Sequence, residues 1–490
     1  MRSICACALA VLVACCLLAP AVQARDIYVA IAGNNSWPGT SAQPYRTIKY
    51  AVSQSVNGDR ILVRAGTYPE SWIYVKGGTE LVSVDALWAA KIYGAGSSVI
   101  RLEQSNSGID GFEIYGDWNQ GNPGDGLVRP LNSTNVWVKN CLVHDAPYDC
   151  DVIKIGANNV LIENCVVYNP AHRTDNTSYQ ECIDTYGTPA PNTVTVRGCW
   201  IFHTPARGGD YLLYAKGGSK NILWENNVFG PAYSGPGGNA STSAGGPSPS
   251  VYPSCENFIA RNNLFLECSG DGAFGLLGVR NCEFYNNVIW GYKGSRAAVE
   301  FWTALPGGSK NENFKFKNNI VMNQAQPVFS DRGYMPVAFE HDYNIYYQTG
   351  GGGSVNINAE ANSLFVDPKL TSPSTPALGA DTWASIVARF RPKFNSPAID
   401  AALNLGPLVS LDVLAVPRPF GPAYDIGAYE VLSGDANADG HVDVVDLLIL
   451  VDAFGAVVGD ANYDPTCDFN ADGGVDVVDL LYLVDTFGLY

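Results

Sequence analysis

The sequence contains few charged residues and very little methionine. Asp, Glu, Lys and Arg make up 16% of the 490 residues, and Met occurs 3 times. Because 47% of the residues are hydrophobic, this composition excludes an intrinsically disordered chain and predicts an ordered core. Gly (51) and Tyr (26) are abundant, which favours all-β structure over helical structure. Beyond residue 24 no apolar run is long enough to cross a membrane, so we expect no transmembrane segment.

Basic residues are absent from the last part of the sequence. From Asp435 onward there are twelve Asp and no Glu, Lys or Arg, whereas the preceding residues contain 35 acidic and 30 basic side chains. Most of the formal net charge of −17 therefore belongs to the tail, where it indicates cation binding. Clusters of Lys and Arg of the kind that bind nucleic acids are absent too, so we expect no nucleic-acid partner.

The first residues have the features of an export signal. Arg2 precedes an apolar run over residues 4–18, and Val22-Gln23-Ala24 fits a small-x-small cleavage site. We therefore predict a signal peptide over residues 1–24 and a secreted or extracellular protein. Attachment to a complex at the cell surface is one extracellular location that fits this prediction. Leu12-Val13-Ala14-Cys15 also fits a lipoprotein cleavage box, which is the second alternative.

Nine cysteines follow the predicted signal peptide. An odd number leaves at least one thiol outside any intramolecular disulfide, and the sequence does not give the pairing. Three of the nine end copies of a repeat, where we expect small buried side chains stacked on one another. The nine are Cys141, Cys150, Cys165, Cys182, Cys199, Cys255, Cys268, Cys282 and Cys467.

One seven-residue pattern occurs seven times, at intervals of 24 to 36 residues. Fixed patterns at such intervals predict a solenoid, propeller or array. Polar and apolar residues alternate within each copy, so the copies are strands. Coils of this length with about three short strands fit a parallel β-helix. The copies are Asn135-Val-Trp-Val-Lys-Asn-Cys141, Asn159-Val-Leu-Ile-Glu-Asn-Cys165, Thr193-Val-Thr-Val-Arg-Gly-Cys199, Asn221-Ile-Leu-Trp-Glu-Asn-Asn227, Asn257-Phe-Ile-Ala-Arg-Asn-Asn263, Asn281-Cys-Glu-Phe-Tyr-Asn-Asn287 and Asn313-Phe-Lys-Phe-Lys-Asn-Asn319.

The sixth position of the repeat is Asn in every copy except one, which has Gly198. Asn and Gly are the residues that best adopt positive φ, so this position predicts a sharp bend between two strands of one coil. Rungs of stacked strands lie about 4.8 Å apart. The sixth-position amides are therefore expected to form a ladder along the solenoid.

Short segments flank the repeats and are expected to close the solenoid. Residues 47–56 form an amphipathic stretch that could plug the first coil, and residues 396–400 and 425–430 are expected to close the other end. Together with the opening motifs these segments resemble secreted right-handed β-helix proteins of the pectate-lyase-like superfamily, across residues 26–431. The opening motifs are Ile27-Tyr-Val-Ala, Gly33-Asn-Asn, with Asn35 where the superfamily more often has Asp, Pro38-Gly-Thr40, Pro44-Tyr-Arg-Thr-Ile48 and Ala65-Gly-Thr-Tyr68.

Two loops in the acidic tail have the spacing of EF-hand calcium loops. Each places oxygen side chains at positions 1, 3, 5, 9 and 12, Gly at position 6 and a backbone carbonyl at position 7, and each leads into an apolar helix, over residues 447–454 or 480–487. The first set of ligands is Asp435, Asn437, Asp439, His441, Asp443 and Asp446, and the second is Asp468, Asn470, Asp472, Gly474, Asp476 and Asp479.

Asp at position 12 and one helix per loop make this tail resemble a type I dockerin. The chain thus divides into a β-helix domain over residues 25–431 and a dockerin over residues 432–490. The resemblance implies two bound Ca²⁺ ions and a cohesin-type partner, chosen in part by Val444-Val445 and Val477-Val478 at loop positions 10 and 11. A purely structural calcium module is the alternative.

Polar residues of three successive coils could meet on one face of the β-helix. The superfamily resemblance implies an extended polysaccharide substrate and, commonly, β-elimination, in which a cation neutralises the uronate carboxylate and a Lys or Arg removes the α-proton. Lys216 is the leading candidate for the base and Lys154 the second. Aligning the coils on Gly156, Gly187 and Gly217 does not put Lys154, Asp184 and Lys216 at one position. The residues that could hold substrate or a further Ca²⁺ are Asp149, Asp151, Glu181, Asp184 and Asp210.

These observations favour a secreted polysaccharide lyase of acidic, uronate-containing polymers. A non-catalytic glycan-binding or scaffold β-helix is the alternative, because charged groups on a solenoid face are often only solvated. A glycoside hydrolase on the same fold is a third hypothesis, although the Gly-His-Gly and Arg-Ile-Lys signatures of polygalacturonases are absent. The sequence does not identify the sugar of the substrate or the cohesin partner.

Overall fold

The computed structural model describes seventeen stretches of the chain. They are residues 24–94, 98–117, 125–147, 150–170, 180–186, 190–205, 211–215, 218–232, 241–245, 255–269, 272–294, 296–302, 311–330, 335–349, 360–437, 441–470 and 472–488. The predicted signal peptide, apart from Ala24, lies outside them. None of the helices in these stretches has the length and apolar character that a membrane crossing needs.

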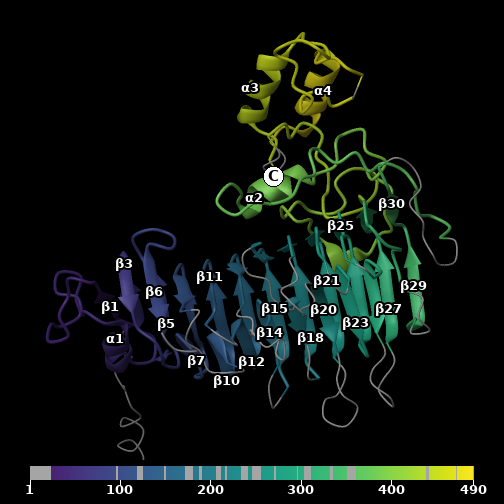
Figure 1. The fold of residues 1–490 in the computed structure, drawn as a ribbon. Helices are drawn as coiled ribbons and strands as arrows, with labels where there is room; N and C mark the ends of the chain where they lie inside the picture. The colour runs from purple at the N-terminus through teal and green to yellow at the C-terminus, as the bar shows by residue number, and fades with distance from the viewer. Residues whose placement is uncertain are drawn as a thin grey trace, which may run out of the picture.

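The body of the protein is a right-handed parallel β-helix, as predicted, with its strands stacked side by side along one axis (Figure 1). Three parallel sheets, A, B and C, run the length of the solenoid. Strands β10 (Gly126–Lys139) and β12 (Asp151–Glu163) are long enough to begin in sheet C and continue into sheet A. Each coil therefore passes through C, A and B in turn.

The strands of sheet A carry the repeat. Besides parts of β10 and β12 they are β1 (Asp26–Val29), β2 (Arg60–Val63), β5 (Glu80–Ser83), β8 (Ser107–Asp110), β15 (Asn192–Arg197), β18 (Lys220–Glu225), β21 (Glu256–Arg261), β24 (Arg280–Tyr285), β27 (Glu312–Lys317) and β29 (Val337–Asp342). Sheet C holds β4 (Ile73–Tyr74), β7 (Ile100–Leu102), β14 (Ile183–Thr185), β17 (Tyr211–Ala215), β20 (Ser241–Gly245), β23 (Phe274–Leu277) and β26 (Val299–Trp302).

Sheet B consists of shorter strands that follow the bend. They are β3 (Gly66–Pro69), β6 (Ala90–Gly94), β9 (Glu113–Gly116), β11 (Leu142–His144), β13 (Val166–Tyr168), β16 (Trp200–Phe202), β19 (Val228–Phe229), β22 (Leu264–Leu266), β25 (Val288–Trp290), β28 (Ile320–Met322) and β30 (Ile345–Tyr347). Alternate side chains of all three sheets point inward and form one continuous core.

The sixth-position residues make the predicted bend between sheets A and B. Their φ angles lie between 51° and 62°, in the left-handed region that Asn and Gly tolerate best. The predicted ladder of their amides is wrong, because in the described residues only one bond joins two of them, from Asn318 to Asn286 at 3.3 Å. Several of these amides instead bond to a segment that returns from the C-terminal side.

The amide ladder lies one residue later, at the inward-facing seventh position. The side-chain amide N–H of each member donates to the side-chain oxygen of the next member, at 3.0 to 3.2 Å. Each of these accepting oxygens also accepts a backbone N–H of the neighbouring coil. The same column begins with Cys141, Cys165 and Cys199, which are buried and reduced, as predicted. The ladder residues are Asn227, Asn263, Asn287, Asn319 and Asn344, all fully buried.

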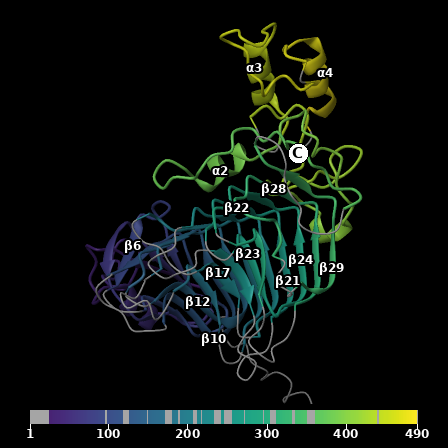
Figure 2. The same ribbon diagram turned by 45° about the vertical axis from the view of Figure 1, so that its right-hand side comes forward.

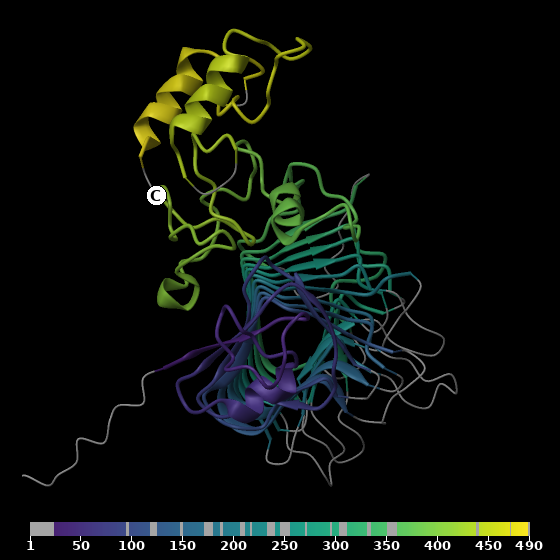
Figure 3. The same cartoon turned by 90° about the vertical axis from the view of Figure 1, so that its left-hand side faces the viewer.

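The N-terminal plug is helix α1 (Ile48–Gln54), which covers the first coil (Figure 3). Thr47 caps it through a side-chain bond to the Tyr50 N–H, and the Glu70 carboxylate accepts the N–H groups of Ile48 and Lys49. Ile48, Ala51 and Val52 are buried against the core. These contacts remove the open end that an uncapped solenoid would expose.

Residues 360–364 continue the last coil, where Leu364 pairs in parallel with Ile345 of β30. The predicted closing segments, residues 396–400 and 425–430, instead belong to residues 365–431, here called the C-terminal wrap. The wrap folds back over the outer side of sheet B and includes helix α2 (Trp383–Arg389) and the short 3-10 helix η1 (Gly406–Val409) (Figure 2). Ile386, Phe390 and Tyr429 of the wrap pack on outward apolar side chains of sheet B. The wrap thus buries a second core that the repeat pattern does not reveal.

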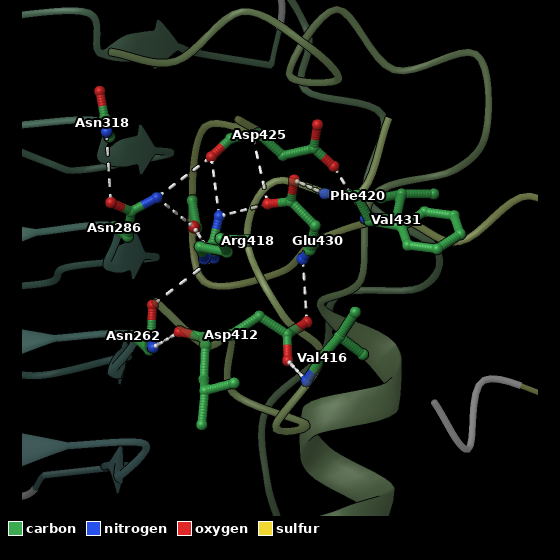
Figure 4. Close-up of polar contacts among 12 residues, drawn as sticks. Asn262, Asn286, Asn318, Asp412, Val416, Arg418, Phe420, Asp425, Glu430 and Val431 are labelled. Carbon is green, nitrogen blue, oxygen red and sulfur yellow. Dashed lines mark hydrogen bonds and ion pairs between the residues drawn. The ribbon is translucent and has the colours of Figure 1, made fainter. Parts of the chain in front are cut away.

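The bend asparagines hold the wrap in place (Figure 4). Asn262 donates to the Leu411 carbonyl, Asn286 to the carbonyls of Asp425 and Gly427, and Asn318 to that of Leu403. At the centre the fully buried Arg418 pairs with Glu430 at 2.8 Å. Three of the sixth-position amides therefore bind another part of the chain, and of these three described residues only Asn318 also donates to a neighbouring amide of the same column.

The tail, residues 432–488, contains helices α3 (Val444–Ala453) and α4 (Val477–Thr486), which pack together (Figure 1). Both begin three residues before the predicted starts, because Asp443 and Asp476 form capping boxes with Asp446 and Asp479. Val442, Leu450 and Phe469 of the tail share a cluster with Val416 of the wrap. The tail core is therefore continuous with the body.

Candidate active site

The structure aligns charged side chains in one column across sheet C. Arg101 pairs with Arg129 in register, and Lys154 pairs with Asp184. The pairings of Val128 with Ile153 and of Leu131 with Gly156 place Arg129 opposite Lys154. Neighbouring rungs are about 4.8 Å apart, so four charged groups follow one another along the sheet.

Three carboxyl groups meet beside this column. Asp151 is the first residue of β12, Glu181 precedes β14, and Asp184 is its central residue. One oxygen from each lies within 4.8 Å of the others, and all three residues are buried. The Asp151 carboxylate also accepts the Glu181 N–H at 2.9 Å, which fixes the two loops relative to each other. Oxygen ligands of this kind suit Ca²⁺ or Mg²⁺.

Lys154 links two of these carboxylates. Its Nζ lies 2.8 Å from Asp151 Oδ2 and 3.3 Å from Asp184 Oδ2, and its side chain is 11% exposed. Burial alone would lower the pKa of Lys154, but the charges of Asp151 and Asp184 outweigh it and raise the pKa above its ordinary value. A raised pKa favours the protonated form of Lys154, which opposes the predicted role as a base and suits a fixed positive charge.

Arg129 is a part of the site that the sequence analysis missed. Its side chain is 13% exposed and its Nε lies 3.5 Å from Asp125 Oδ1, in an ion pair. Both Nε and Nη1 are buried and form no hydrogen bond with the described residues. Burial lowers the pKa of Arg129, opposed by Asp125. Buried donors without partners are costly, so they mark a place where an anion or water would bind. The alternation of strand β10 could have identified Arg129 as an outward residue.

Arg101 extends the column toward exposed aromatic rings. Its guanidinium lies over Trp72, 5.4 Å from the ring centroid, and over Tyr74 at 6.0 Å. It also pairs with Asp125 at 3.0 Å and with Glu103. An aromatic surface beside charged groups is a combination that binds sugar rings and their polar substituents.

The structure brings together four of the predicted residues and leaves others untested. Asp151, Glu181 and Asp184 converge, with Lys154 bound between two of them. The alignment on glycines did not put Lys154 and Asp184 at one position, whereas in the structure the two are direct partners and Tyr214 takes the same position in the next coil. Gly187 and Gly217, which were used for that alignment, lie outside the described residues. Lys216, Asp149 and Asp210 lie outside the described residues.

The two tail loops have matching geometry. The backbone N–H of position 3 donates to the position-12 Asp in both, at 3.1 and 3.2 Å, and that of position 9 does so at 2.9 and 2.8 Å. The position-12 residues, Asp446 and Asp479, are fully buried. Asp439 lies outside the described residues. A set of carboxylate, amide and carbonyl oxygens fits a hard cation such as Ca²⁺, although within the described part of the chain only the sheet C triad has three carboxylates within 4.8 Å.

Equivalent apolar side chains project from α3 and α4. Their exposed fractions agree closely between the helices, from 40% to 59%. Val444 and Val445, predicted to help choose a partner, belong to this set with Val477 and Val478. The full set is Val444, Val445, Leu448, Val451 and Phe454 on the first half, and Val477, Val478, Leu481, Val484 and Phe487 on the second.

Comparison with known proteins finds relatives over parts of the chain. Residues 31–75 match a family described as a protein of unknown function (DUF1565). Pectate lyase PEL9 of Emericella nidulans is 40% identical over 100 residues, which are 20% of this chain. The chain thus spans 22% of the length of that relative.

Two solved structures cover more of the chain at lower identity. The structure of pectate lyase Pel9A is 15% identical, with a TM-score of 0.47, and the match covers 83% of this chain and 96% of that one. The structure of a rhamnogalacturonan lyase is 16% identical, with a TM-score of 0.46, and covers 71% and 91% of the two chains.

Proposed function

We propose that the β-helix is a secreted polysaccharide lyase that cleaves an acidic, uronate-containing polymer by β-elimination at the sheet C column. The observation that carries the proposal is the buried triad of Asp151, Glu181 and Asp184 with Lys154 among its carboxylates. The 100-residue match to a pectate lyase supports the same class of substrate. Secretion rests on the predicted signal peptide.

The geometry of the triad favours a divalent cation at this site. One carboxyl oxygen from each of Asp151, Glu181 and Asp184 lies within 4.8 Å of the others, and all three residues are buried. Ca²⁺ binds through oxygen ligands of this kind, so one Ca²⁺ is the group that we propose at the triad.

The residues of the column have distinct roles in this proposal. A bound Ca²⁺ would neutralise the uronate carboxylate and make its α-proton more acidic. Arg129 offers Nη1, which is buried without a hydrogen bond to the described residues, to a substrate oxygen. Lys154, protonated between two carboxylates, supplies a fixed positive charge that stabilises negative charge developing on the substrate. Lys216 remains the proposed base, and Trp72 and Tyr74 would support neighbouring sugar rings.

The test is ultraviolet absorbance of the unsaturated product with pectate, alginate and glycosaminoglycans, with calcium and with chelator. We expect a calcium-dependent rise with a uronate polymer. Asp184→Asn should reduce the rate at least 100-fold and lower the bound calcium by one ion per chain, whereas the surface control Asp26→Asn should change neither. A flat trace with every polymer, from folded protein, would refute the lyase.

A non-catalytic glycan-binding β-helix is the second candidate. The burial of all three triad carboxylates favours it, because an enclosed ion can be purely structural. It predicts retention on a polysaccharide affinity gel without unsaturated product. A reducing-sugar assay on the same samples then separates it from a hydrolase.

For the tail we propose a dockerin that binds two Ca²⁺ and docks to a cohesin-type partner. The repeated loop geometry and the equivalent apolar faces of α3 and α4 support this. Exposed apolar patches of this kind are typical of interaction sites. Capture by immobilised cohesins should require calcium and should fail when Leu448 and Leu481 are both changed to Glu in folded protein. Capture that is equal in chelator would refute the proposal.

A further inference from the structure

Arg391 joins the body of the protein to the first tail loop. It follows α2, and its backbone is fixed by bonds to Thr371, whose N–H and hydroxyl both donate to the Arg391 carbonyl. The side chain is 7% exposed and lies 3.2 Å from Asp435 Oδ2. It also donates to the carbonyls of Asp435 and Leu432, at 3.1 and 3.4 Å. Asp435 is position 1 of the first loop, so a buried cation of the body pairs with a proposed calcium ligand.

The surroundings hold this cation in place. The Arg391 guanidinium lies 5.7 Å from the centroid of the Phe394 ring, and that ring packs edge-on against Phe469 of the tail at 4.9 Å. A cavity of about 280 Å³ at the junction is lined by Arg391, Phe394, Asp435 and Asn437, among others. Positions 1 and 3 of the first loop therefore face the body, where the positive charge of Arg391 is fixed.

The second loop is an internal control for the first. The backbone bonds to the position-12 Asp agree between the loops within 0.1 Å, and both position-9 Asp side chains cap their helices at 2.7 Å. One difference between the described parts of the loops lies at position 1. Asp468 accepts the Tyr463 hydroxyl at 2.7 Å, and among the described residues no Lys or Arg forms an ion pair with it.

We infer that Arg391 makes the two calcium sites unequal in affinity, the first loop being the weaker site. In the absence of metal, the pairing of Arg391 with Asp435 holds this first loop against the body. The inference rests on the proposal that the tail binds calcium. Arg391 already neutralises Asp435, so a cation entering the first loop meets a fixed like charge within a few ångströms. Among the described residues no Lys or Arg compensates the carboxylates of the second loop, which in this proposal depend on calcium for balance.

The experiment is calorimetric titration of calcium into the full-length secreted chain, in an Asp184→Asn background that lacks a ligand of the proposed sheet C site. We expect two sites at least tenfold apart in affinity. Asp479→Asn should remove the tighter site, and Asp446→Asn should remove the weaker one. Arg391→Gln should tighten the weaker site at least fivefold, whereas Arg391→Lys, which keeps the charge, should preserve the gap.

Each result decides between the alternatives. Two equal sites, or loss of the tighter site in Asp446→Asn, would overturn the role of Arg391 while leaving the calcium-binding tail intact. No calcium bound at either loop would overturn the tail proposal itself. Circular dichroism shows whether Arg391→Gln folds. If this variant does not fold, Asp446→Asn and Asp479→Asn still show which loop holds the weaker site and so test the inference.

Discussion

Removing one amide from the buried ladder should destabilise the β-helix far more than removing one from its surface. In Asn287→Ala the Asn263 backbone N–H loses its acceptor, which lies at 2.9 Å, and becomes an unpaired buried donor. The donations of Asn287 to the Ala260 carbonyl and the Asn319 side chain, at 3.0 and 3.2 Å, are lost as well. One orphaned buried donor costs about 1–3 kcal/mol and each lost bond about 1 kcal/mol, so we expect a loss of about 3–5 kcal/mol.

The matched control is Asn281→Gly in the exposed ladder formed by the first position of the repeat. Asn281 donates to Asn257 at 3.0 Å in contact with solvent, and its φ of 55° suits Gly. Its substitution should change stability by about 0.5 kcal/mol or less, as is usual at surfaces. The assay is urea unfolding followed by Trp fluorescence. A loss below about 1 kcal/mol in Asn287→Ala, or one equal to that of the control, would refute the account of the ladder.

Two further predictions concern buried titratable groups. All nine described cysteines are buried and reduced, and burial raises the pKa of Cys255 and Cys268 to about 12. We therefore expect a thiol reagent to leave the native protein unmodified and to label nine thiols after unfolding. A thiol that reacts rapidly in the native protein would contradict this prediction. Burial also raises the pKa of Asp425 and Glu430; Arg418 pairs with the Glu430 carboxylate and donates to the backbone carbonyl of Asp425. A carboxyl group whose pKa is higher in the folded than in the unfolded chain contributes stability that is full below the unfolded pKa of about 4 and is lost as the pH rises toward the folded pKa. The urea midpoint should therefore fall between about pH 5 and pH 8, and Glu430→Gln should flatten that slope; an unchanged slope would contradict the assignment.

The repeat was enough to predict the solenoid and its bends, because period-two alternation and Asn at positive φ are local properties of each coil. The same pattern placed the amide ladder at the wrong position. Asn262 and Asn287 look alike in the sequence, yet one faces the wrap and the other the core. Which of two adjacent amides faces inward depends on the geometry of the bend, which the sequence pattern did not resolve.

The candidate site was predicted in part for a related reason. Acidic residues cluster in the sequence at two strands of sheet C, β12 and β14, so Asp151, Glu181 and Asp184 could be predicted. The alternation of β10 marks Arg129 as an outward residue, but Arg129 stands between Val128 and Pro130, and only its pairing across the sheet places it in the site. The pairing of Arg391 with Asp435 joins segments that share no motif, so no pattern indicates it.

The wrap also affects the order in which the chain can acquire its structure. The bonds from Asn262 and Asn286 to the wrap join residues 139 to 149 positions apart, whereas successive coils join residues about 30 apart. Closing the longer loops costs more chain entropy and is favourable only after the coils have formed a surface to receive them. Coils should therefore assemble first and the wrap should settle onto finished sheet B. Because the tail is attached to the wrap, it should reach its place on the body last.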